Sequence, residues 1–161
     1  MAAGIDATLS RLETVVQGCD SSAEWRRSLQ RLSTLEDAEA LGAGLDLRYW
    51  LTLTPHEEVP IVSGALVTLK AKAELELARY FGGGSLMGRD FHALHKALQI
   101  QADTVQQSLE HPSNWDTANT GLVLCTLARS RLAKPAAPDL LLWVIELDVM
   151  IRYARPATVV A

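Results

Sequence analysis

Residues 139–153 read DLLLWVIELDVMIRY and decide the expected fold class. The stretch is apolar on nearly every side, and Pro138 and Pro156 bound it. A transmembrane helix needs about 20 predominantly apolar residues, whereas this stretch is shorter and contains Glu146, Asp148 and Arg152. The pattern therefore predicts a helix surrounded by protein, either at the centre of a bundle or in a dimer seam.

Six further segments are expected to be helical, and no segment shows sustained alternation of apolar and polar residues. Capping residues at Ser21 and Thr34 begin two of them. In the longest, residues 60–81, lysine and glutamate stand four residues apart, which is the spacing of favourable pairs on a helix. A short strand is conceivable only at residues 47–53, where Tyr, Trp and Thr suit a strand, although a helix is preferred there too. The six expected helices cover residues 5–17, 21–32, 34–45, 60–81, 90–111 and 116–133.

Length and composition indicate one globular domain. The chain has 161 residues, close to the usual size of about 150 per domain. Its 48% hydrophobic and 21% charged residues are typical of a folded protein. We therefore expect residues 1–161 to form a single-domain, all-α bundle of five to seven helices, with residues 155–161 as a loose tail.

Net charge and the two cysteines indicate which partners and which cellular location to expect. The net charge of −4 argues against a broad nucleic-acid surface, although it does not exclude a local patch. Cys19 and Cys125 show no metal-type spacing, and the N-terminus shows no secretory signal. These features predict a cytoplasmic protein with reduced cysteines and no membrane contact.

A cluster of arginines is the candidate for contact with phosphate or an acidic partner. Arg26, Arg27 and Arg31 lie close to Trp25, and Arg27 and Arg31 share a face of the expected helix. Guanidinium groups can bind phosphate or carboxylate. Most such short clusters are solvated helix surface, so nucleic-acid binding is the weaker hypothesis.

His92 and His95 are the candidate metal ligands. They lie three residues apart on an expected helix, close enough to share a metal only if further ligands converge. The sequence supplies no HExxH pattern and no acidic pair on the same face. A solvated His92 and a His95 at the helix edge are therefore expected, with no metal and no cofactor.

Glu146 and Asp148 are the candidate functional carboxylates, because carboxylates in apolar surroundings often serve as acids or bases. On a helix, residues two apart point in nearly opposite directions and cannot act as a pair. Asp148 and Arg152, four apart, would suit an ion pair. Glu146 is the most anomalous residue, and a structural role is favoured for it over a functional one.

The expected function is that of a non-enzymatic interaction protein. Surplus apolar surface, with four tryptophans in one modest domain, favours a self-associating subunit or an adaptor that forms a homo-oligomer, and a protein partner is a further alternative. A second hypothesis is a small all-α hydrolase that uses helical carboxylates and a divalent metal. A third is a nucleic-acid-associated structural subunit, similar to a viral or phage coat protein.

Overall fold

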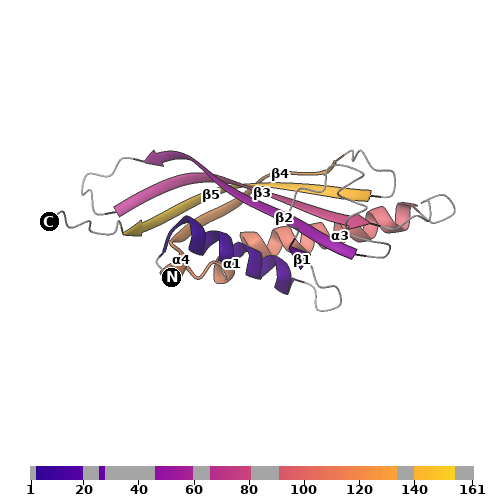
Figure 1. The fold of residues 1–161 in the computed structure, drawn as a ribbon, viewed down its shortest axis with the longest axis horizontal. Coiled ribbons are helices and arrows are strands. Elements are labelled where there is room, and N and C mark those ends of the chain that lie inside the picture. The colour runs from indigo at the N-terminus through magenta and orange to yellow at the C-terminus, as the bar shows by residue number, and fades with distance from the viewer. Residues whose placement is uncertain are drawn as a thin grey trace.

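The chain folds as one antiparallel sheet with helices packed against it (Figure 1). The computed structural model describes residues 3–19, 26–27, 46–59, 66–80, 91–133 and 140–154. The expected all-α bundle is wrong, because this part of the chain contains four long antiparallel strands and only three α-helices. In chain order, the elements are α1 (Ile5–Gly18), β1 (Arg26–Arg27), β2 (Asp46–Val59), β3 (Leu66–Tyr80), α3 (Phe91–Glu110), the 3-10 turn η1 (Pro112–Asn114), α4 (Thr117–Thr120), β4 (Leu122–Ala133) and β5 (Leu140–Ala154).

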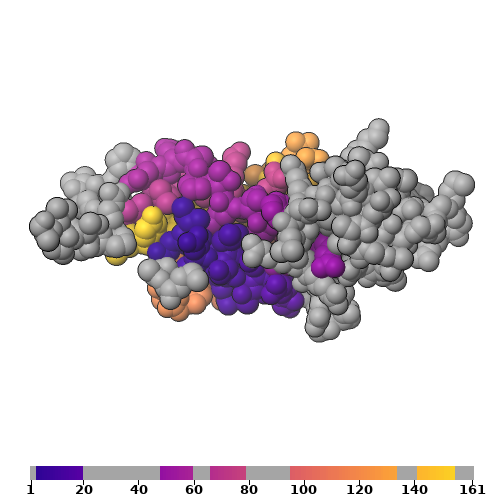
Figure 2. Space-filling model, in the orientation of Figure 1, coloured from indigo at the N-terminus to yellow at the C-terminus, as the bar shows by residue number. Residues whose placement is uncertain are grey.

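The sheet has the strand order β1-β2-β3-β5-β4. The antiparallel pairs β2–β3 and β4–β5 lie side by side because β3 also pairs antiparallel with β5. The chain passes from β3 to β4 through α3, and α1, α3 and α4 lie on the same side of the sheet (Figure 1). The space-filling view shows α1 directly beside β2 (Figure 2).

The stretch that was expected to form the central helix is instead β5, an inner strand. Residues 141–145 are all buried, which explains why the sequence looks apolar on every side. After Ile145 the strand alternates: Leu147, Val149 and Ile151 are buried, whereas the even-numbered residues between them are more accessible. The period of two is hard to recognise in the sequence because the uninterrupted apolar run before it has no period of its own.

The expected helix at residues 60–81 is also wrong, since residues 66–80 form β3. Residues four apart share a face in a strand as well as in a helix, because four is an even number. The spacing of Lys70 and Glu74 therefore fits both structures, but in a strand it corresponds to about 13 Å, too far for an ion pair. Lys70 instead places its Nζ 3.4 Å from a carboxylate oxygen of Glu57 on β2.

Residues 46–59 and 122–133 are strands too. The strand alternative for residues 47–53 was the right one, because this segment lies inside β2. Only the first turn of the expected helix at residues 116–133 is helical, and Gly121 separates that turn, α4, from β4. Gly121 has a φ of 79°, and a Cβ there would collide with the carbonyl oxygen of Arg152. The N–H of Arg152 donates to the Gly121 carbonyl at 2.7 Å, which fixes this close approach.

The expected helices at residues 5–17 and 90–111 are confirmed as α1 and α3. Their apolar sides pack on the odd-numbered residues of β3 and β5 to form the core. Among the described residues, no helix is long and apolar enough to cross a lipid bilayer. The expected helix at residues 34–45 and the tail at 155–161 lie outside the described residues. The core includes Leu12, Val16, Tyr49, Leu75, Leu98, Val105, Leu109, Trp143, Ile145 and Leu147.

Candidate functional site

The side of the sheet opposite α1 and α3 collects most of the charged strand residues. At one end of this side Glu76, Ala78, Leu142 and Val144 are buried. The part of this side that runs from Glu74 and Glu146 to the opposite ends of the strands is largely accessible, and we call it the open face. The open face consists of Thr52, Thr54, Glu57 and Val59 of β2, Leu66, Thr68, Lys70, Lys72 and Glu74 of β3, Leu124, Thr126 and Arg129 of β4, and Glu146, Asp148, Met150 and Arg152 of β5.

Glu146 lies at the centre of the open face, between two charged neighbours. Its Cα partner on β3 is Glu74, and its partner on β4 is Arg129. Directly opposed side chains in an antiparallel pair have Cβ atoms about 4.5–5.5 Å apart, so the two carboxylates repel each other. Arg129 supplies an opposite charge on the other side of Glu146. Glu146 therefore belongs to a row of charges that crosses three strands.

Asp148 lies on the same face as Glu146, which corrects the expectation that the two residues point apart. Residues two apart in a strand share a face and are separated by about 7 Å. The Cα partner of Asp148 on β3 is Lys72, which gives a second, oppositely charged cross-strand pair. The expected ion pair with Arg152 is wrong, because four residues of strand span about 13 Å. Arg152 instead donates from Nε to Oγ1 of Thr68 at 3.3 Å.

The histidines lie on the other side of the sheet. His95 on α3 is half-buried, and its ring centroid lies 6.0 Å from that of Trp143. The backbone of His92 is in the first turn of α3, while its side chain lies outside the described part. Within the described ranges, no three His, Cys, Asp or Glu residues are grouped so that they could hold a metal ion. The structure therefore does not bring His95 together with Glu146 or Asp148.

Two of the three candidate arginines lie on a strand and not on the expected helix. Arg26 and Arg27 form β1, which pairs parallel with β2 at Arg48 and Tyr49. Arg31 lies outside the described residues. The helix face on which Arg27 and Arg31 were expected to lie together is therefore replaced, at Arg27, by a strand.

Both outer edges of the long strands are interrupted. On β4, the N–H of Leu127 donates to Oε1 of Glu110, the last residue of α3, at 2.6 Å. The β4–β5 register also shifts twice, between Leu122 and Leu124 and between Leu127 and Arg129. On β2, Pro55 lacks an N–H, and the register shifts beside it. Such features hinder the addition of another strand to a sheet edge.

Cys125 is buried beside this edge and is chemically protected. Burial, and then the negative charge of Glu110, raise the pKa of the Cys125 thiol to about 12. The thiol is therefore protonated at neutral pH, and the reactive thiolate is essentially absent. Cys125 acts as a small apolar core residue.

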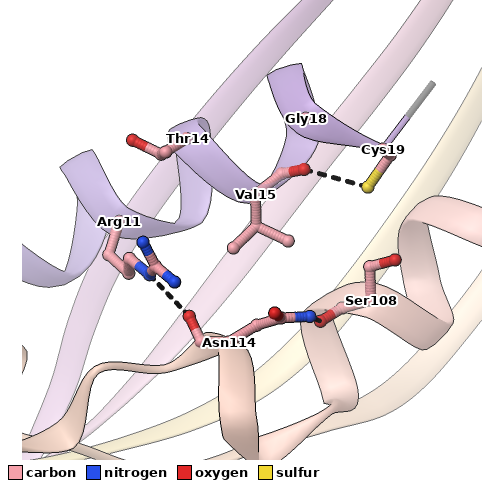
Figure 3. Close-up of a pocket in the computed structure, with 7 residues that line it drawn as sticks. All are labelled: Arg11, Thr14, Val15, Gly18, Cys19, Ser108 and Asn114. Atoms are coloured by element: carbon pink, nitrogen blue, oxygen red, sulfur yellow. Dashed lines mark hydrogen bonds between the residues drawn. The ribbon is translucent and has the colours of Figure 1, made fainter. Parts of the chain in front are cut away.

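A polar groove runs along the outer side of α1 and was not foreseen from the sequence. It consists of two adjoining hollows of about 220 Å³ and 380 Å³ that share Arg11 and Thr14, and we call them together the α1 groove. Figure 3 shows the smaller hollow, between α1, the end of α3 and the turn that carries Asn114. The larger hollow is lined by residues of α1 and α4, which pack against each other. The groove is lined by Ala7, Ser10, Arg11, Thr14, Val15, Gly18, Cys19, Ser108, Asn114, Asp116, Asn119 and Thr120.

The sequence does not indicate the α1 groove, because its lining residues are far apart along the chain. Arg11 and Asn114, for example, are about a hundred positions apart, and only the fold brings them together. The open face and the α1 groove are two accessible surfaces on which charged and polar side chains gather in the described part of the chain. No protein-family model matches the sequence, and no curated protein matches it significantly.

Proposed function

We propose that the protein is a non-enzymatic interaction protein that self-associates, with the open face as the contact between two copies. The observation that carries this proposal is the charge balance of the open face. Within its bounds the carboxylates and the cations are equal in number, whereas the whole chain has a net charge of −4; Arg48, Glu76 and Arg131 lie on the same side of the sheet but at its buried end. The carboxylates are Glu57, Glu74, Glu146 and Asp148, and the cations are Lys70, Lys72, Arg129 and Arg152.

A balanced face suits a contact between identical copies. In a two-fold symmetric dimer the same surface lies on both sides of the contact. A face of one sign would repel its own copy, while a face that mixes both signs can place carboxylates opposite cations. Charge complementarity therefore favours a second copy of this chain as the occupant.

Apolar side chains at one end of the open face support the same proposal. Leu66 and Leu124 are 44% and 38% exposed, which is unusual for large apolar residues in this structure. Met150 is the Cα partner of Leu124, so the two side chains are neighbours on adjacent strands. Leu66 lies farther along the same face, opposite Ala154. Apolar side chains interspersed with charged ones are compatible with a protein–protein interface.

The size of the open face indicates a modest affinity. Four strands about 4.8 Å apart and about nine residues long, at about 3.3 Å per residue, cover roughly 600 Å². A typical stable interface buries about 800 Å² on each partner. The open face therefore supports a reversible dimer rather than an obligate one. Since the outer strand edges are interrupted, the contact uses the face of the sheet rather than an added strand.

The side-chain methyl groups provide a direct test. Met150 lies on the open face, and Ile100, which is 56% exposed on α3, lies on the helical side and serves as the internal control. On raising the protein concentration in a methyl NMR experiment, we expect the Met150 signal to shift while the Ile100 signal stays constant. A shift of Ile100 alone, or no concentration dependence of either signal, would contradict the proposal.

A cytoplasmic location is part of the proposal. Neither Cys19 nor Cys125 forms a disulfide within the described part of the chain. Reduced cysteines are typical of cytoplasmic proteins.

A further inference from the structure

The geometry of the α1 groove points to a second site, one that binds the carboxylate of a small polar molecule through Arg11. This inference is independent of self-association, because the α1 groove lies on the helical side of the sheet, away from the open face.

Arg11 is held in place before any ligand arrives. Its Nε donates to the carbonyl oxygen of Asn114 at 2.6 Å. Asn114 is fixed in turn, because its Nδ2 donates to the Ser108 carbonyl at 2.9 Å and its N–H donates to the His111 carbonyl at 2.9 Å. Figure 3 shows the guanidinium group between α1 and this turn. A positioned side chain loses less conformational entropy when it binds a ligand.

The terminal nitrogens of Arg11 are left for a ligand. Nε is used by Asn114, and the two terminal nitrogens make no hydrogen bond or ion pair with another described residue. These two nitrogens form a planar fork whose geometry matches the two oxygens of a carboxylate. Because Arg11 lines both hollows, a ligand in either one can reach the fork.

The charges of the groove favour a singly charged ligand. Arg11 is the one cation and Asp116 the one anion among the described residues that line it. Both Asp116 carboxylate oxygens accept from Nδ2 of Asn119 at 3.0 Å, which keeps this charge in place. A phosphate group carries about −1.5 to −2 at neutral pH and would be repelled by Asp116 more strongly than a carboxylate. A carboxylate is therefore the better match.

Size and polarity define the rest of the ligand. The larger hollow, about 380 Å³, falls at the lower end of small-molecule sites, which are roughly 300–1,000 Å³, and the smaller one, about 220 Å³, lies below this range. Hydroxyl and amide groups of Ser10, Thr14 and Asn119 line them. The ligand is thus a polar molecule of the size of an amino acid or a dipeptide end.

Amide NMR shifts test the chemical class. The wild-type protein is titrated with acetate, acetamide and inorganic phosphate to about 10 mM, so that a site with a dissociation constant of about 1 mM is mostly occupied. We expect acetate to shift the amides of Arg11 and Asn114 while acetamide does not. A serine dipeptide is compared with its amidated form: tighter binding of the free dipeptide than of acetate identifies a peptide end, and equal binding identifies a small carboxylate. Equal shifts with acetamide, tighter binding of phosphate, or no shifts with any probe would overturn the assignment.

Variants test the role of Arg11. Arg11→Gln removes the fork and should weaken acetate binding at least tenfold, whereas Arg129→Gln removes a cation from the open face and should not change it. Thr14→Trp places a large side chain in the wall that the two hollows share and leaves the Arg11–Asn114 hydrogen bond intact. This variant should also abolish binding, and it decides the question if Arg11→Gln does not fold. Unchanged binding in Arg11→Gln or in Thr14→Trp would refute the site.

Discussion

The Cys125 thiol should make the protein progressively less stable above about pH 9, and the size of the effect follows from its place in the core. Cys125 is fully buried, and its pKa rises from 9.0 to about 12 in the folded chain. Between these values the unfolded chain releases the thiol proton while the folded chain keeps it. The free energy of unfolding should therefore fall by about 1.4 kcal/mol for each pH unit in this range. Below about pH 9 both states are protonated and the effect vanishes.

Urea unfolding of the wild type and of Cys125→Ala isolates this contribution, because the lysines and tyrosines titrate in both proteins. At about pH 7 the variant should be the less stable protein by about 1 kcal/mol, since the substitution leaves a small cavity. At about pH 10 this difference should shrink by roughly 1.4 kcal/mol and reach zero or change sign. A difference that stays constant from neutral to alkaline pH would show that the folded protein does not hold the thiol in its protonated form.

Three further substitutions test residues that hold the sheet and its neighbouring turn in place. Glu110→Ala removes the acceptor for the edge N–H of β4 and should destabilise the protein by about 1–3 kcal/mol in urea unfolding; an unchanged midpoint would mean that water replaces the carboxylate at no cost. Gly121→Ala should cost at least about 1–3 kcal/mol, because a positive φ and a collision with a β5 carbonyl both oppose the new side chain, and a thermal melt checks this. Glu146→Gln removes the repulsion by Glu74 together with the attraction by Arg129, so the free energy of unfolding from a thermal melt should change by no more than about 0.5 kcal/mol. A larger rise in this free energy would show that the charge is retained at the expense of stability.

The sequence was sufficient to find the helices that form the core. In α1 and α3 the apolar residues recur with the helical period, and no period of two competes with it. The strands were missed for two separate physical reasons. Spacings of four residues in β3 satisfy both periods, and the first half of β5 is buried on both faces and so has no period. The pairing of β3 with β5 joins segments about seventy residues apart, which local patterns do not reveal.

The candidate residues show how far the functional prediction depends on the secondary structure. Glu146 and Asp148 are charges within an apolar stretch, which makes them candidates from the sequence, and they do lie on an accessible face. The relation between them was wrong, because a helix separates residues two apart and a strand places them together. The α1 groove could not be predicted at all, since Arg11, Asn114 and Asp116 become neighbours only after folding.

Static light scattering of the wild type, Asp148→Lys and Asp103→Lys tests self-association through the open face most directly. Both substitutions change the net charge equally, but Asp148 lies on the open face and Asp103 on the exposed side of α3. At about 100 µM, well above a dissociation constant of about 1 µM that corresponds to −8.2 kcal/mol, the wild type and Asp103→Lys should scatter mainly as dimers. Asp148→Lys unbalances the charges of the open face and should scatter mainly as a monomer. A monomeric wild type at this concentration, or equal dimerisation of all three proteins, would contradict the assignment of the open face as the interface.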